Sequence, residues 1–144
     1  MNEGQLKQRT KDFAIKVLNF VEALPRSRSF EHVGKQLLRC GTSVGANYRA
    51  SCRAKSQADF IAKLSIVEEG ADEVMFWLEI LTDSNLYAEN LHREEVVWLY
   101  NEANELISIV VASIKTARLN QSKIANPNSK ILRGVTQAAK GDRL

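Results

Sequence analysis

The sequence predicts an all-α protein, an up-down-up-down antiparallel four-helix bundle, and three observations lead to this prediction. Four segments repeat apolar residues at alternating steps of three and four positions, the period of a helix with one buried face. Seven Gly and two Pro are too few for the turns of an all-β chain, and 44% hydrophobic residues are too many for a disordered one. A length of 144 residues suits one domain. We expect the bundle over residues 1–119 and a disordered basic tail over residues 120–144.

The first helix is predicted over residues 6–24 and ends there because Pro25 cannot continue a helix. Its apolar residues lie on one face, since they step by four and three along the chain. The central stripe of that face consists of Leu6, Thr10, Phe13, Val17, Phe20 and Leu24. The residues expected to widen the buried face are Ala14, Ile15, Leu18 and Val21.

The second helix is predicted from an N-cap at Ser29 to about Arg53, around an apolar stripe that includes Val33, Leu37 and Val44. Residues 40–46 are nearly all small, and two glycines one turn apart cost roughly 1 kcal/mol each inside a helix. Close approach of another helix would offset that cost. We favour a contact within the chain's own core over a contact between subunits. A loop that splits the helix is the alternative.

The third helix is predicted to start at Ser56, because an N-cap serine followed three positions later by Asp59 resembles a capping box. It carries the most regular heptad pattern of the chain and ends in the polar run of residues 82–85. The heptad positions are Phe60, Leu64, Val67, Ala71, Val74, Leu78 and Leu81.

The fourth helix is predicted from near Leu91 to about Leu119. Its buried face is expected to contain Val96, Leu99, Ala103, Leu106, Val110 and Ser113, and to be widened by Trp98, Ile107, Val111 and Ile114. Four helices of about 20–28 residues would each span ~30–40 Å, so their lengths match in a single bundle.

Charge is distributed in three blocks, although the net charge is only +3. Residues 26–55 carry seven bases and one acid, residues 68–105 eleven acids and one base, and residues 115–144 seven bases and one acid. In an antiparallel bundle, the start of the first helix, the end of the second, the start of the third and the end of the fourth meet at one end. We call this the basic end. The cations predicted to bind nucleic acid there are Lys7, Lys11, Arg49, Arg53, Lys55, Lys63, Lys115 and Arg118. Arg9 is expected to lie among them.

Two further pairings follow from the charges. Arg39 is expected to reach a carboxylate of the third helix such as Glu73, as a buried pair that fixes register. The basic second helix is also complementary to the acidic third and fourth helices of another copy, as a head-to-tail contact requires.

Four stretches of the chain resemble the signature of a bacterial protein family. They are residues 36–50 (QLLRCGTSVGANYRA), 52–66 (CRAKSQADFIAKLSI), 68–73 (EEGADE) and 77–81 (WLEIL). The family consists of four-helix-bundle proteins encoded by intervening sequences in 23S ribosomal RNA genes, and the resemblance covers roughly residues 6–118. Cys40 departs from an expected serine, and Ala50 and Ala54 replace acids, which makes the basic end more positive.

The resemblance implies a homopentameric ring with a central channel. It also implies similarity to the accessory variability protein of diversity-generating retroelements, which binds nucleic acid and a reverse transcriptase. The expected partners are therefore another copy of the chain, RNA or DNA, and a reverse transcriptase or other protein. No catalytic residue and no cofactor come with the resemblance.

Enzymatic and metal chemistry have little support in the sequence. No phosphate-binding glycine loop, nucleophile elbow or His-Glu-x-x-His motif is present, so we expect no enzyme activity and no cofactor. His92 precedes Glu95 by three residues, the reverse of the di-iron order, and His32 stands alone, so no metal site is predicted. Cys40 and Cys52, ~18 Å apart on one helix, cannot form a disulfide within it.

The chain shows no export signal and no apolar run long enough to span a membrane, so we expect a cytoplasmic protein. Our first hypothesis for its function is an oligomeric scaffold whose basic end binds the nucleic-acid backbone. The alternative is a purely structural or protein-interaction module with no nucleic-acid role. An enzyme would need a deep polar pocket, which nothing in the sequence indicates.

Overall fold

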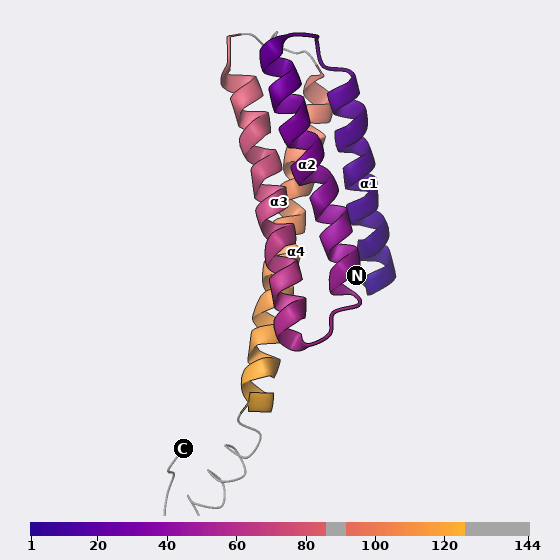
Figure 1. The fold of residues 1–144 in the computed structure, drawn as a ribbon, viewed down its shortest axis with the longest axis vertical. Helices are drawn as coiled ribbons and strands as arrows, with labels where there is room; N and C mark the ends of the chain where they lie inside the picture. The colour runs from indigo at the N-terminus through magenta and orange to yellow at the C-terminus, as the bar shows by residue number, and fades with distance from the viewer. Residues whose placement is uncertain (86–91, 126–144) are drawn as a thin grey trace, which may run out of the picture.

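Four helices make up the described part of the chain, residues 1–85 and 92–125 of this computed structural model (Figure 1). They are α1 (Glu3–Glu22), α2 (Arg28–Ser51), α3 (Gln57–Asp83) and α4 (Arg93–Ala125). Each helix packs against the next one along the chain, whereas α1 meets α4 over a much smaller surface. The predicted all-α, up-down-up-down four-helix bundle is confirmed.

Side-chain caps set where the helices begin. Ser56 caps α3 as predicted, since its hydroxyl accepts a hydrogen bond from the Asp59 backbone N–H at 3.0 Å. Asn2 and Gln5 form a reciprocal capping box that starts α1 three residues before the predicted first position. The predicted Ser29 cap of α2 is wrong. Ser27 is the N-cap, because its extended backbone lets its hydroxyl accept from the Phe30 N–H at 3.1 Å.

The fourth helix is longer than the sequence predicts. It begins at Arg93, after a residue with a left-handed backbone, His92 at φ 53°. It continues to Ala125, six residues beyond the expected end at Leu119. The remainder of the expected basic tail, residues 126–144, lies outside the described residues, as does the expected start of this helix at Leu91.

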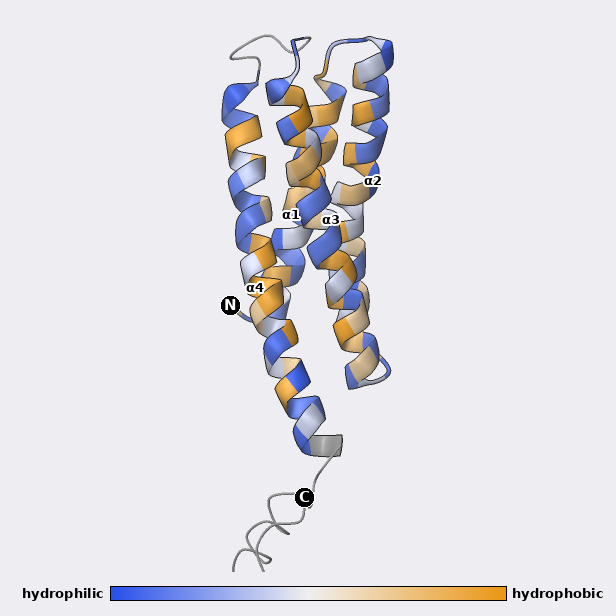
Figure 2. Ribbon diagram, turned by 90° about the vertical axis from the view of Figure 1, so that its left-hand side faces the viewer, coloured by the Kyte–Doolittle hydropathy of each residue, from blue (hydrophilic) through white to orange (hydrophobic). Residues whose placement is uncertain are grey.

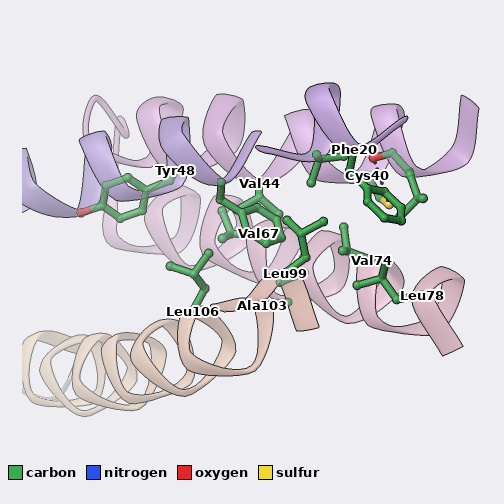
Figure 3. Close-up of a cluster of buried hydrophobic side chains, with 14 of the residues drawn as sticks. Phe20, Cys40, Val44, Tyr48, Val67, Val74, Leu78, Leu99, Ala103 and Leu106 are labelled. Atoms are coloured by element: carbon green, nitrogen blue, oxygen red, sulfur yellow. Dashed lines mark hydrogen bonds between the residues drawn. The ribbon is translucent and has the colours of Figure 1, made fainter. Parts of the chain in front are cut away.

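A single apolar core runs along the bundle axis and receives side chains from all four helices (Figure 3). Hydrophilic and hydrophobic residues share the circumference of each helix, as the predicted amphipathic pattern requires (Figure 2). The largest fully buried side chains are Phe13, Leu37, Leu64, Leu78, Leu99 and Leu106, all of them on predicted stripes.

The predicted width of two buried faces needs correction. Ile15 and Leu18 do not join the core but are 44% and 50% exposed, because α1 has a broad partner only in α2. On α4, Ile114, expected only to widen the buried face, is buried at the central position that the strict heptad gave to Ser113, whereas Trp98 is 39% exposed. A straight helix of 3.6 residues per turn drifts away from a seven-residue repeat, so the buried stripe moves on by one position.

The two glycines of α2 lie in a continuous helix, and the alternative of a loop is wrong. A Cβ on Gly41 would stand 2.8 Å from both γ-carbons of Val17, which is fully buried. A Cβ on Gly45 would stand 3.1 Å from the backbone oxygen of Thr10. Both glycines therefore serve the close packing of α1 on α2 within one chain, as we favoured.

Candidate nucleic-acid interface

The basic end is formed by the four chain segments that the topology predicts. The first turn of α1, the last turn of α2 and the first turn of α3 lie at the same end of the bundle as the C-terminal part of α4 (Figure 1). The Gln57 side-chain amide donates to the Ala117 carbonyl at 3.3 Å, which places α4 beside the start of α3. Lys115 and Arg118 flank that contact and are exposed.

Three of the predicted cations converge on one groove. Lys7 and Lys11 of α1 face Arg49 of α2 across an open hollow of about 510 Å³ between the two helices. We call it the α1–α2 groove, and it is lined by Gly4, Lys7, Gln8, Lys11, Ala14, Thr42, Gly45, Ala46 and Arg49. None of these lining residues is acidic, so every charge on the lining itself is positive.

Short side chains make the groove. Ala14 of α1 and Gly45 and Ala46 of α2 leave no bulk between the helices, and Gly45 lets α2 approach the α1 backbone. Lysines spaced by four residues share one face of a helix, so Lys7 and Lys11 stand above the same hollow. The small-residue run that the sequence analysis explained by packing therefore also shapes a surface feature.

The predicted cations differ in how far they are already neutralised. Lys63 forms an ion pair with Asp59 at 3.2 Å, and Lys7 forms a weak one with Glu3 at 4.0 Å. The pKa of Asp59 is lowered by hydrogen bonds from the Lys55 backbone N–H and from Lys63, so this carboxylate stays charged. Lys63 is accordingly the weakest candidate for a phosphate contact.

The remaining predicted cations are open to solvent. Within residues 1–85 and 92–125, no carboxylate lies within 4.0 Å of the side-chain nitrogens of any of them. All of them are exposed. They are Lys11, Arg49, Arg53, Lys55, Lys115 and Arg118.

Arg9 does not belong to this set, contrary to expectation. Its Nε donates to Glu102 at 2.7 Å, and its Nη2 bonds to both Glu102 and Glu105. These hydrogen bonds, those that Arg9 donates to Glu102 above all, raise the pKa of Arg9. Arg9 therefore ties α1 to α4, where the two helices pack least, and gives no free charge to the basic end.

The predicted contact between Arg39 and Glu73 is present, with one correction. The Arg39 guanidinium bonds to the Glu73 carboxylate, which also accepts from the Trp77 indole N–H at 3.1 Å. The side chains of Arg39 and Glu73 are 58% and 34% exposed, so the pair lies at the surface and not in the core. It links α2 to α3, and its charges are satisfied within the chain.

The two cysteines are free thiols in the described structure. Cys40 is buried, and burial raises the pKa of its thiol to about 12. Cys52 is half-buried beside Tyr48, whose pKa is raised by burial and by this thiol. Among the described residues, no group of three or more His, Cys, Asp or Glu side chains could hold a metal ion.

None of the described helices combines the length and the apolar character needed to cross a membrane. The longest of them, α4, carries charged residues from its first turn to its last.

Comparisons with known proteins found one matching family model and a similar solved structure. A family model described as 23S rRNA-intervening sequence protein matches residues 2–112. A crystal structure from Bacteroides thetaiotaomicron VPI-5482, described as a protein with unknown function from the S23 ribosomal protein family, is 33% identical. The match has a TM-score of 0.70 and covers 80% of this chain and 99% of that one. No curated protein matches the chain.

Proposed function

The chain belongs to the 23S rRNA-intervening sequence protein family, and from this premise we propose that it is a non-enzymatic, self-associating bundle that binds the nucleic-acid backbone at its basic end. The observation that carries the proposal is the convergence of Lys7, Lys11 and Arg49 on a groove whose described lining holds no acid. Unpaired cations from the turn after α2 and from α4 extend this positive surface.

Backbone contact is the mode of binding that these residues favour. Lysine and arginine neutralise phosphates without reading sequence, so affinity falls steeply as salt rises. Base stacking requires exposed aromatic side chains, but near this end Tyr48 is buried in the core and Phe60, in the first turn of α3, is partly buried against it. We therefore expect binding that tolerates many sequences and depends strongly on ionic strength.

A salt series tests this function. Binding of the 144-residue protein to RNA and DNA is measured between about 50 and 200 mM salt, a range over which a protein with several phosphate contacts loses orders of magnitude in affinity. The double variant Lys11→Glu with Arg49→Glu should weaken binding to all sequences and reduce the salt slope by about 2. The matched control, Arg28→Glu with Lys35→Glu, makes the same change of charge at the opposite end. Salt-independent binding, or an equal loss in the control, would refute the proposal.

Self-association is supported by apolar side chains that one copy leaves uncovered. Ile15 and Leu18 on α1, Val97 and Trp98 on α4, and Phe76 on α3 are exposed. Surfaces of opposite charge on α2 and on α3 with α4 suit a head-to-tail contact, which forms a ring when the rotation between neighbouring copies closes. We propose the pentamer that the family resemblance implies. Light scattering would then give five times the 16.2 kDa chain mass, and a monomer would contradict it.

The alternative function is a structural or protein-interaction module, with a second protein such as a reverse transcriptase as its partner. The same exposed apolar side chains favour it, because apolar side chains that one copy leaves uncovered are available to pack against another protein. The two functions differ in whether nucleic acid accompanies the protein. The ratio of absorbance at 260 and 280 nm of protein purified at low salt distinguishes them. A raised ratio shows that nucleic acid has copurified, and the ratio of protein alone favours the alternative function.

A further inference from the structure

We propose that the α1–α2 groove is a subsite for single-stranded nucleic acid, whose phosphodiester chain lies between Lys7 and Lys11 on one side and Arg49 on the other. This inference rests on the proposed function and adds to it the form of nucleic acid that is preferred. Duplex would meet only the exposed cations around the bundle end, whereas a single strand would also enter the groove.

The width of the groove carries the first step. Packed helices have axes about 8–10 Å apart, so the hollow between α1 and α2 is narrower than a whole duplex, since in B-form DNA one groove alone is ~12 Å wide. An open hollow of about 510 Å³ with a floor of Ala14, Gly45 and Ala46 admits a single extended chain. The shape of the groove therefore excludes a duplex from its floor, and a duplex can contact only the side chains at its rim.

The spacing of the cations carries the second step. Lys7 and Lys11 are separated by four residues of helix, which is ~6 Å along the axis of α1. Neighbouring phosphates of one strand advance by ~3.4 Å along the axis of a duplex, but they lie further apart than this rise because the backbone winds around the axis. The two lysines therefore suit neighbouring phosphates of one strand, while Arg49 contacts the chain from α2.

The lining also argues against the main competitor, an acidic amphipathic helix of a second copy or of another protein. Helix-in-groove recognition depends on large apolar side chains that enter apolar pockets. The apolar floor here consists of glycine and alanine, which offer little area for such anchors. A chain that carries a negative charge on every unit gains more from the three cations.

The lining predicts little preference among bases. No aromatic side chain is among the described residues that line the groove, so bases would point to solvent and not stack on the protein. Oligouridine and oligoadenosine of equal length should therefore bind with affinities within about threefold of each other, a difference of under 1 kcal/mol.

A steric variant separates groove binding from general electrostatics. Ala46 is exposed and lines the groove, so Ala46→Trp fills the hollow without any change of charge. Ala62→Trp on α3 is the matched control, since Ala62 is also an exposed helical alanine and does not line the groove. Both variants should keep the helical circular dichroism of the wild type.

The probes are a 12-nucleotide oligouridine and a 12-base-pair RNA duplex, titrated by fluorescence anisotropy at 100 mM salt. Ala46→Trp should weaken oligouridine binding about tenfold, equal to ~1.4 kcal/mol, and change duplex binding less than twofold. The control should change neither. Equal effects on both probes, or no effect on either, would overturn the subsite and leave the salt-dependent function standing. A wild-type protein that binds neither probe would remove both.

Light scattering on the same variants measures their mass in solution and shows whether a second copy of the chain occupies the groove instead of nucleic acid. If the groove holds nucleic acid, Ala46→Trp should have the same mass as the wild type. A fall in mass would assign the groove to a contact between copies and overturn the proposal.

Discussion

The contact between Gly41 and Val17 gives the sharpest test of how α2 packs on α1. Gly41→Ala places a methyl group 2.8 Å from both γ-carbons of Val17, closer than carbon atoms approach without displacement. Val17 is fully buried and β-branched, so it has neither space nor rotamer freedom to yield. The two side chains should therefore show strong energetic coupling.

The magnitude follows from opposing terms. Overpacking costs about 1–3 kcal/mol, and replacing a helical glycine by alanine returns about 1 kcal/mol. With so short a contact we expect Gly41→Ala to destabilise by about 2 kcal/mol. Val17→Ala removes two buried methyl groups and should cost about 2.5 kcal/mol. In the double variant the added methyl occupies vacated space, so the total should be about 1.5 kcal/mol instead of the additive 4.5 kcal/mol.

Urea unfolding followed by circular dichroism at 222 nm measures this cycle. All four proteins are compared at one protein concentration, because self-association shifts apparent stability. An unchanged m-value shows that the variants unfold the same surface. Additivity within about 0.5 kcal/mol, or a more stable Gly41→Ala, would show that α2 does not press on Val17 in solution.

Two further predictions concern charges at the ends and sides of the bundle. The pKa of Asp59 is lowered in the folded chain, so this carboxylate stabilises the fold above its unfolded pKa of about 3.9, and the contribution is lost as pH falls through the folded value. Urea midpoints of wild type and Asp59→Asn should therefore differ at pH 7 and converge once the pH has fallen through the lowered folded-state pKa, and a constant difference would contradict this. Arg9→Leu leaves the largely buried Glu102 without its partner and should destabilise by about 2 kcal/mol, whereas the double variant with Glu102→Gln should recover part of that loss. Equal midpoints for wild type and Arg9→Leu in the same urea assay would show that the bridge between α1 and α4 contributes nothing.

Most of this fold could be predicted from the spacing of apolar residues, because apolar residues at alternating steps of three and four indicate a helix with one buried face. Phe13 and Leu78 are buried for this reason. The Ser56 cap of α3 was predictable because it depends only on residues next to each other in the sequence, a serine followed three positions later by an acid. The contact between Arg39 and Glu73 could also be predicted from the sequence. When a basic helix packs beside an acidic one, few carboxylates lie at the height of Arg39 along the bundle axis.

The exposure of side chains beside the buried stripes and the choice of N-cap were harder to predict from the sequence, because both depend on neighbours in space that the sequence does not specify. Ile15 and Leu18 are apolar and adjacent to the stripe, yet α4 lies too far from α1 to cover them. Ser27 and Ser29 are chemically equal caps, and the choice depends on the path of the turn after Pro25. Asn2 was missed because its signal, a reciprocal pair with Gln5, precedes the first apolar residue.

The division between structural and free cations on α1 shows what only the three-dimensional arrangement can decide. Arg9 and Lys11 are two residues apart, which turns their side chains by about 200° around the helix. One therefore points toward α4 and the other toward the groove with α2, but the sequence is compatible with either assignment until the handedness of the bundle is known. The acids of α4 lie on the side of Arg9, so its charge is consumed within the chain. Lys11 faces a groove with no acid among its described lining residues, and its charge remains available to a ligand.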